Sequence, residues 1–277
     1  MKPKVEITHK DKILFPKEKI TKEEVAAYYL LVAKFMLPLI KDRPISMHRF
    51  PKGIHNEGFF QKQPPKNLPT WIKTTKVKRK QKESFPMLLC QEKETLLWLA
   101  NQNCITPHIW LSKIDKPNLP DRMIFDLDPS TKKQFPTVVK GALALRKIIE
   151  EEMKLKAFVM TTGSKGLHVV VPIQRKYSFD QVRAIAHSIA KKLVNEHPEK
   201  FTQEIRKDKR EGKVYVDTMR NGFAQTTVAP YAIRALDGAP IATPLFWEEL
   251  KNKKLRPDLY TIRNIRSRLK KNPWLGI

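Results

Sequence analysis

The sequence predicts an α+β fold, in which strands and helices mix without strict alternation. Short apolar runs rich in β-branched and aromatic residues, such as residues 123–127 and 167–171, predict buried strands. Longer amphipathic stretches, two of them opened by a capping box, predict helices. Because these elements do not repeat as regular βαβ units, a mixed or antiparallel sheet with flanking helices is favoured over a doubly wound parallel sheet.

Composition points to a polyanionic partner. The chain has 277 residues, with 54 Lys and Arg against 28 Asp and Glu, which gives a formal net charge of +26. Such an excess is typical of nucleic-acid binding. No apolar run approaches the roughly 20 residues of a spanning helix, so we expect no membrane partner and a cytoplasmic protein. Cys90 and Cys104 form no C-x-x-C pair, which excludes a zinc ribbon and a disulfide framework.

The first part of the chain is predicted to combine strands with two helices. Thr21 and Glu24 form a capping box that begins the first helix, and Pro38 follows its expected end at Leu37. The other expected elements are strand 5–15, strand 44–50, strands 71–77 and 85–89 joined by a basic tip at 76–80, and helix 94–103.

The second part continues in the same mixed manner. Ser178 and Gln181 form another capping box, which begins a helix with one apolar face. Thr243 and Pro244 have the residue types of a helix start. The other expected elements are strand 123–127, a helix from 136 to 149, strands 158–161, 167–171 and 214–217, and a basic helix over 262–269.

The acidic strand 123–127 is the most informative stretch. Side chains alternate across a strand, so Asp126 and Asp128 project from one face, roughly 6–7 Å apart. At an effective dielectric of about 20 their repulsion is on the order of 2–3 kcal/mol. A divalent cation relieves that repulsion, and carboxylate oxygens suit Mg²⁺ or Mn²⁺. The alternative is a solvated Asp-rich turn without chemistry.

A glycine-containing turn between two strands forms a second candidate site. Its glycines let backbone N–H groups face an anion, and its hydroxyl, ammonium and imidazole groups add donors. It is not a Walker A loop, because the spacing and the following helix are missing. The alternative is a hairpin with incidental polar residues. The candidate anion ligands are Thr162, Gly163, Ser164, Lys165, Gly166 and His168.

A third carboxylate and three phosphate donors are further candidate residues. Asp217 would join Asp126 and Asp128 if its strand lies beside theirs, and three carboxylates are typical of two-metal catalysis. Arg220, Gln225 and Arg234 offer donors for phosphates, although Arg234 fits a structural ion pair almost equally well.

Phe59 and Phe60 follow a glycine and have lysines nearby. A strand is expected to expose one of these rings and bury the other, and an exposed ring beside cations suits base stacking. The alternative is that both rings lie in the core.

These motifs, in this order, resemble the archaeo-eukaryotic primase superfamily, and within it the polymerase domain of DNA ligase D, which acts in non-homologous end joining. The resemblance covers nearly the whole chain. Its matching blocks are residues 11–16, 43–44, 58–62, 125–129, 163–168, 228–231, 234–235 and 243–245.

The resemblance implies one primase-polymerase domain over residues 1–277. Its N-terminal DNA-binding part, an α/β extension, would cover 1–115, and a catalytic core with an RRM-like sheet would cover 116–277. Asp126, Asp128 and Asp217 would hold two Mn²⁺ or Mg²⁺ ions. The triphosphate of a ribonucleotide or deoxyribonucleotide would be held by Ser164, Lys165 and His168 with the help of Arg234.

The DNA contacts follow from the same resemblance. Lys12 and Lys22 would hold a 5′-phosphate at a gap or broken end, and Phe59 or Phe60 would stack on the template, near Lys62. Further implied positions are Arg210 near the primer end and His108 near the metal site. The family prefers ribonucleotides; here His48-Arg49 replaces the expected Lys-Arg pair, which bears on the sugar contacts and the strength of that preference.

The resemblance also implies partners. No K-x-D-G ligase motif is present, so we expect a free-standing polymerase or one excised from a longer protein. A Ku-type end-binding protein and a separate ligase would act with it, at the nucleoid of a prokaryotic cell.

The function predicted is template-directed nucleotidyl transfer that fills gaps and extends ends in double-strand-break repair. The alternatives are a replicative primase, which two isolated cysteines do not favour, and a nuclease, which has no use for the glycine turn. A non-catalytic DNA-end-binding module would leave three acidic residues in a basic chain without a role.

Overall fold

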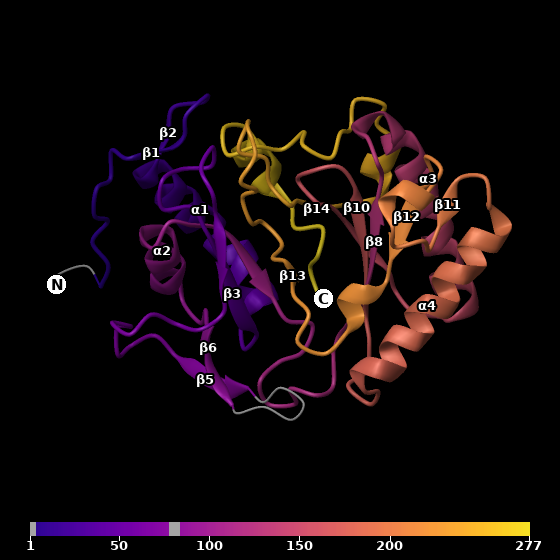
Figure 1. Cartoon of the computed structure of the whole chain (residues 1–277), viewed down its shortest axis with the longest axis horizontal. Helices are drawn as coiled ribbons and strands as arrows, with labels where there is room; N and C mark the ends of the chain where they lie inside the picture. The colour runs from indigo at the N-terminus through magenta and orange to yellow at the C-terminus, as the bar shows by residue number, and fades with distance from the viewer. Residues whose placement is uncertain (1–3, 78–83) are drawn as a thin grey trace. The chain divides into compact units, whose positions relative to one another are not determined.

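A computed structural model describes residues 4–77 and 84–277, which form two compact units (Figure 1). Unit 1 comprises the described residues up to Pro117 together with Thr226–Ala242 and Tyr260–Asn272. Unit 2 comprises Asn118–Gln225, Thr243–Leu259 and Pro273–Ile277.

The division of the chain differs from the expected one in its second half. The first boundary, at Pro117, lies two residues from the expected position, but two later segments belong to unit 1. The reason is strand pairing: β13 (Thr227–Val228) pairs antiparallel with β7 (Cys104–Ile109). Such a long-range pairing has no local signature in the sequence.

Unit 1 is built on a sheet with the order β13-β7-β3-β6-β5, and β4 pairs with β3 beside this path. A separate two-stranded sheet joins β1 and β2. Besides β7 and β13, the elements of unit 1 have these bounds: β1 (Ile13–Phe15), β2 (Ile20–Thr21), α1 (Lys22–Ile40), β3 (Pro44–Arg49), β4 (Phe59–Gln61), β5 (Thr74–Val77), β6 (Phe85–Leu89), α2 (Lys93–Asn101) and a 3₁₀ helix at Ile265–Lys270.

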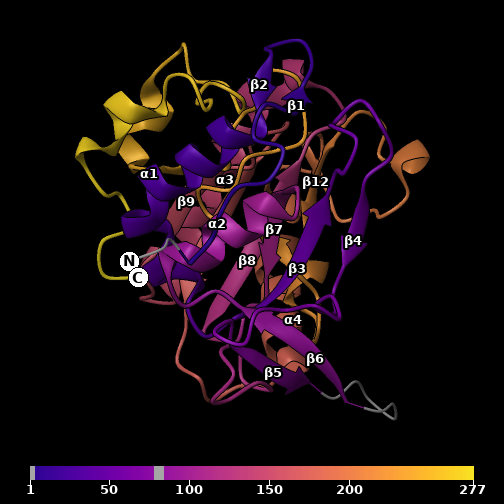
Figure 2. The same ribbon diagram turned by 90° about the vertical axis from the view of Figure 1, so that its left-hand side faces the viewer.

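Helix α1 begins as predicted and ends later. Thr21 Oγ1 accepts from the Glu24 N–H, and the Glu24 carboxylate accepts from the Thr21 N–H, so the capping box is confirmed. The helix runs through Pro38 to Ile40, because a proline in the last turn removes only one backbone hydrogen bond. Helices α1 and α2 pack together, and α2 lies beside β7 (Figure 2).

Unit 2 contains a sheet with the order β11-β12-β8-β10-β9-β14. Its elements are β8 (Arg122–Asp128), α3 (Phe135–Lys147), β9 (Phe158–Thr161), β10 (Leu167–Pro172), α4 (Phe179–Glu196), β11 (Phe201–Thr202), β12 (Val214–Asp217) and β14 (Pro244–Leu245), with a π-helical turn at Ile148–Glu152 and 3₁₀ helices at Lys132–Gln134, Lys207–Lys209, Met219–Asn221 and Trp247–Lys251.

The four central strands confirm the RRM-like core. They lie in the order β12-β8-β10-β9, and α3 and α4 connect them as two split βαβ units. Both helices contact β8 (Figure 1). Phe125 and Leu127 are completely buried, and they alternate with Asp126 and Asp128 on the other face of β8.

Three expectations about secondary structure were wrong. The residues expected to start a helix at Pro244 form the edge strand β14 instead, with Pro244 opposite Met160 of β9, and an edge strand tolerates the missing proline N–H. The strand expected over 5–15 is confined to Ile13–Phe15, and the C-terminal helix is the short 3₁₀ turn already named. Residues 78–80 of the expected basic tip lie outside the described residues. No helix in the described ranges is long and apolar enough to cross a membrane.

Candidate functional site

A row of three polar side chains crosses the middle of the unit 2 sheet. Asp126 of β8 lies directly opposite His168 of β10 on one side and Asp217 of β12 on the other. Directly opposed residues of antiparallel strands have Cβ atoms about 4.5–5.5 Å apart. Asp128 lies two residues further along the same face, opposite Tyr215. The expected adjacency of the three aspartates is therefore confirmed, while their role as metal ligands stays a prediction.

Asp217 is the most enclosed of the three carboxylates. Its side chain is 15% exposed, against 20% for Asp126 and 40% for Asp128. Burial raises the pKa of Asp217 above its ordinary value, and the negative charge of Asp126 raises it further, although the Met219 N–H donates to Oδ1 at 2.7 Å. This electrostatic conflict is what a cation at the site would relieve.

His168 closes the row on the other side. Its Nε2 lies 3.4 Å from Asp126 Oδ2, and its side chain is 5% exposed. Its Nδ1 is buried and has no hydrogen-bond partner. A buried imidazole nitrogen of this kind suits a ligand atom, because leaving it unpaired costs free energy.

Asp128 is engaged by an arginine that was predicted to contact DNA. Arg210 is buried, and its Nη1 donates to Asp128 Oδ2 at 3.2 Å. Its Nε and Nη2 donate to the carbonyl oxygens of Glu204 and Ile205, and its guanidinium lies 4.1 Å from the Tyr215 ring centroid. Arg210 thus neutralises a site carboxylate from within unit 2.

The donor set fits a hard divalent cation by its chemistry, since it consists of carboxylates that repel one another. As the side chains stand, however, no group of three or more His, Cys, Asp or Glu in the described part of the chain is arranged to hold an ion. Asp128 makes its ion pair with Arg210, and Asp217 accepts from Met219. A metal at Asp128 would therefore compete with the guanidinium.

The glycine turn has the backbone conformation that its residues predict. Gly163 has a φ of +67°, which favours glycine. A Cβ at Gly166 would lie 1.9 Å from the Leu127 carbonyl oxygen, so only glycine fits beside β8. The turn therefore lies directly against the strand that carries Asp126.

The donors of this turn differ from the expectation. Thr162 Oγ1 accepts from the N–H groups of Ser164 and Gly166, at 3.3 and 3.1 Å, so these amides organise the turn itself. Lys165 is exposed and donates to the Ser130 carbonyl at 3.3 Å. Anion contacts would then come from side chains such as Lys165 more than from a nest of backbone amides.

Asn221 is a site residue that the sequence reasoning missed. It is completely buried, and its side-chain amide bonds to the backbone N–H and C=O of Ile124 at 2.8 and 2.7 Å. It thereby fastens the turn after Asp217 to β8. Arg220, in the same turn, is half exposed with its Nε 3.9 Å from Asp217 Oδ2. Gln225 is exposed beyond that turn.

The predicted nucleotide ligands divide between the two units, because His48 and Arg234 belong to unit 1. Burial lowers the pKa of His48, and the charge of Arg234 lowers it further. His48 stacks on Phe60 with a centroid distance of 4.1 Å and an interplanar angle of 7°. His108, also in unit 1, packs edge-on against Phe60 at 5.1 Å.

Both phenylalanines of β4 are exposed, so the expectation that one would be buried was wrong. Phe59 is 45% and Phe60 is 53% exposed. Strand β4 is three residues long and pairs with β3 beside the main path of the sheet. Arg49 lies over the Phe59 ring at 5.5 Å. Lys62, next to the strand, is also exposed.

The two lysines predicted to hold a 5′-phosphate belong to one part of unit 1. The Lys22 N–H donates to the Lys12 carbonyl at 2.8 Å. Lys22 is buried, and its Nζ donates to the Thr8 carbonyl at 2.8 Å. Burial lowers the pKa of Lys22, and the charge of Lys12 lowers it further, so an anion beside both ammonium groups would be stabilising.

Comparison with known proteins gives a consistent result. The family model of the LigD primase-polymerase domain matches residues 21–274. The chain is 31% identical over 270 residues to the bifunctional non-homologous end joining protein LigD of Bacillus subtilis, covering 97% of this chain and 43% of that protein. It is 32% identical over 256 residues to the multifunctional LigD of Mycolicibacterium smegmatis, covering 91% of this chain and 33% of that protein. The chain thus spans less than half the length of these relatives.

A solved structure agrees over nearly the whole chain. The polymerase domain of Mycobacterium tuberculosis ligase D, solved in complex with DNA, superposes with a TM-score of 0.90 at 28% sequence identity. The match covers 99% of this chain and 96% of that one.

Proposed function

The chain belongs to the family of LigD primase-polymerase domains, and from that premise we propose that it is a template-directed nucleotidyltransferase. It would fill gaps and extend broken ends during double-strand-break repair by non-homologous end joining. The observation that carries this proposal is the row of Asp217, Asp126 and His168 across three adjacent strands, with Asp128 beside it.

In the proposed reaction, the 3′-hydroxyl of a primer attacks the α-phosphate of an incoming nucleotide, and pyrophosphate leaves in line. The protein contributes positioning and charge neutralisation more than covalent chemistry. Ser164, Lys165 and His168 would hold the triphosphate beside the carboxylate row, because the glycine turn lies against β8. Arg220 adds a positive charge near Asp217.

Asp126, Asp128 and Asp217 would hold Mn²⁺ or Mg²⁺, which would supply charge neutralisation at the phosphates and a more acidic 3′-hydroxyl. The support for this assignment is the mutual repulsion of Asp126 and Asp217 and the raised pKa of Asp217. Arg210 holds Asp128 by an ion pair at 3.2 Å, so we propose that this contact loosens in the reactive state.

Unit 1 would contact the DNA and the sugar of the nucleotide. We propose that Lys12 and Lys22 bind a 5′-phosphate and that Phe59 and Phe60 stack against template bases, which exposed aromatic rings favour. A preference for ribonucleotides would depend on contacts near His48. A Ku-type end-binding protein and a separate ligase are the proposed partners, in a prokaryotic cytoplasm.

The central test is an extension assay on a gapped, 5′-phosphorylated duplex, comparing ribonucleotides with deoxyribonucleotides and Mn²⁺ with Mg²⁺. We expect the Asp126→Ala, Asp128→Ala double variant to lose nucleotide addition while it retains DNA binding. Undiminished extension by this variant would remove the carboxylates from catalysis.

A second test addresses the DNA end. Replacing Lys12 and Lys22 with Ala is expected to remove the preference for 5′-phosphorylated over hydroxyl-ended gaps, with Lys17 and Lys19 replaced as the charge-matched control. The affinity for DNA is expected to fall steeply with salt, because phosphate neutralisation releases counterions. A flat salt response, or an unchanged end preference, would contradict this part of the proposal.

A further inference from the structure

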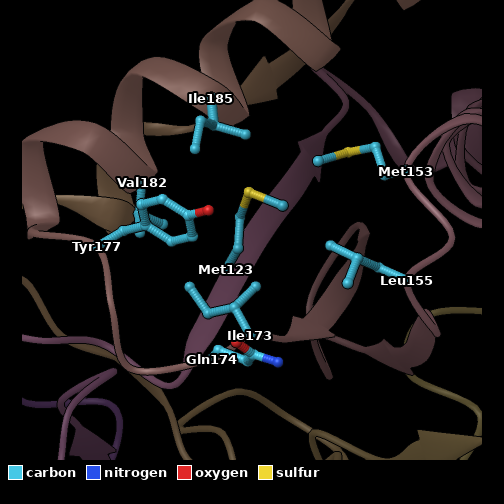
Figure 3. A pocket seen from close by; sticks show the side chains of 8 residues that line it. All are labelled: Met123, Met153, Leu155, Ile173, Gln174, Tyr177, Val182 and Ile185. Carbon is cyan, nitrogen blue, oxygen red and sulfur yellow. The ribbon is translucent and has the colours of Figure 1, made fainter.

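Unit 2 contains an apolar cavity of about 290 Å³ beside helix α4 (Figure 3). Six of its eight lining side chains are aliphatic or thioether groups: Met123, Met153, Leu155, Ile173, Val182 and Ile185. Gln174 and Tyr177 supply the polar groups, and Tyr177 is 45% exposed. The cavity is therefore an apolar pocket that is open to solvent and has a polar margin.

The cavity and the carboxylate row lie on different faces of the sheet. Met123 and Asp126 belong to the same strand, β8, and an odd separation along a strand puts two side chains on opposite faces. A molecule bound in the cavity would therefore leave the face of the aspartates uncovered. The cavity has no role in the proposed nucleotidyl transfer.

The segments that form the cavity alternate apolar and basic residues. Lys154 and Lys156 flank Leu155, and Lys176 precedes Tyr177, and all three lysines are exposed. Within residues 4–77 and 84–277, none of these lysines forms an ion pair. Lys156 lies over the Phe158 ring at 4.9 Å. Three lysines without carboxylate partners thus lie next in sequence to the lining residues Leu155 and Tyr177.

Three of the nearby acidic side chains have partners of their own, and the remaining exposed carboxylate, Glu151, is outnumbered by the three lysines. Glu150 pairs with Arg146, and Glu152 pairs with Lys192. Asp180, at the start of α4, pairs with Arg183 at 3.3 Å. The apolar cavity is therefore surrounded by a local excess of positive charge.

We propose that this cavity is a docking site for an acidic segment of another protein, which inserts a bulky apolar side chain such as Leu, Phe or Met. Aliphatic and thioether side chains adapt well to such anchors, and an apolar anchor with flanking charges is a common mode of peptide recognition. Nucleic acid would match the lysines, but its bases bind by stacking on aromatic rings, and Tyr177 is the one aromatic side chain among the eight that line the cavity. The proposal does not depend on the nucleotidyltransferase assignment.

The test begins with selection of random displayed peptides on the immobilised full chain. Enriched peptides are then labelled with fluorescein, and their affinity is measured by fluorescence anisotropy. We expect the enriched peptides to be rich in Asp and Glu around one or two bulky apolar residues. No enrichment, or enrichment of basic or purely polar peptides, would overturn the proposal.

Two variants locate the binding site, each with a matched control. Ile185→Trp fills the cavity, and its control is Leu143→Trp at an exposed apolar position of α3. The double variant Lys154→Glu, Lys176→Glu reverses the margin charge, and its control is Lys140→Glu, Lys191→Glu at exposed positions elsewhere. We expect each test variant to weaken peptide binding by about tenfold or more and each control by less than about twofold.

Thermal unfolding checks that each variant is folded. If Ile185→Trp does not fold, the Lys154→Glu, Lys176→Glu variant still tests the proposal, because its substitutions are at exposed positions. Equal peptide affinity for test and control variants would refute the cavity as the site. Duplex DNA is added as a competitor of the peptide for the native chain. If it displaced the peptide fully there but failed to do so in the Lys154→Glu, Lys176→Glu variant, the lysines would be assigned to nucleic acid instead. Extension activity is expected to be unchanged in both double variants, which separates this proposal from the catalytic one.

Discussion

The side-chain amide of Asn221 bonds to both backbone groups of Ile124, as a neighbouring strand would. A third bond joins its Nδ2 to the Thr218 carbonyl at 2.9 Å. Because Ile124 precedes Asp126 by two residues on the same face of β8, this contact links the turn after Asp217 to the strand that carries Asp126.

Asn221→Ala is therefore expected to lower the free energy of unfolding by about 3 kcal/mol, because it leaves buried backbone groups without partners. Urea unfolding measures the loss. The control is Asn252→Ala, at an exposed position where the side chain accepts only from the Lys254 N–H, and it is expected to change stability by less than about 0.5 kcal/mol. Similar losses in the two variants would show that the Asn221 contacts do not stabilise the turn.

Asp217→Asn is expected to stabilise the fold by on the order of 1 kcal/mol at neutral pH, since it removes a buried charge that faces Asp126. The asparagine Oδ1 can still accept from the Met219 N–H. The same variant is expected to lose nucleotide addition. A gain in stability with a loss of activity is typical of residues retained for function.

Thermal unfolding and the extension assay measure the two effects. Asp208→Asn serves as the control, because Asp208 is exposed and pairs with Arg206, so its replacement brings no gain in stability. A clear loss of stability in Asp217→Asn would mean that the carboxylate stabilises the fold, and it would contradict the view that Asp217 is retained for function at a cost in stability.

Arg210→Ala is expected to cost about 3 kcal/mol, because it leaves Asp128 without its buried partner and two carbonyl groups without their donor. Arg210→Lys is expected to recover only part of this loss, since one ammonium cannot reach all three acceptors in the geometry of a guanidinium. Arg206→Ala, at an exposed ion pair, is the control and is expected to have little effect. Denaturant unfolding would contradict this picture if the lysine variant matched the native chain.

His48 is expected to make the stability of the chain depend on pH. Its pKa is lowered in the folded state, so the unfolded chain binds a proton more readily than the folded chain does. The stability that neutral His48 contributes is complete above its unfolded pKa of about 6.5, and it is lost as the pH falls through the lower folded pKa. In the His48→Gln variant this loss is absent.

The measurement is the free energy of unfolding at about pH 8 and about pH 5 for both proteins. His187→Gln, at an exposed position of α4, provides the control for removal of a histidine. If native chain and His48→Gln lost equal stability on acidification, the surroundings of His48 would not disfavour its charge.

Local sequence determined much of this fold. The capping boxes at Thr21 and Ser178 begin helices where they were expected, because each cap acts through side-chain contacts within one turn. The strands around Asp126 and Asp217 follow from apolar runs, and alternation put Asp126 and Asp128 on one face without further information. The order of motifs also predicted the family, since many separate blocks recur at the right places.

Only the tertiary structure decided how distant segments combine. Pro244 forms a strand because it pairs with the edge of β9. Residues 226–242 join unit 1 because β13 pairs with β7. Arg210 neutralises Asp128, and both rings of β4 are exposed, because burial depends on which segments pack above a residue. Local free energies decide whether a stretch is helix or strand, whereas strand partners and ion-pair partners far apart in sequence are chosen by the packing of the whole chain.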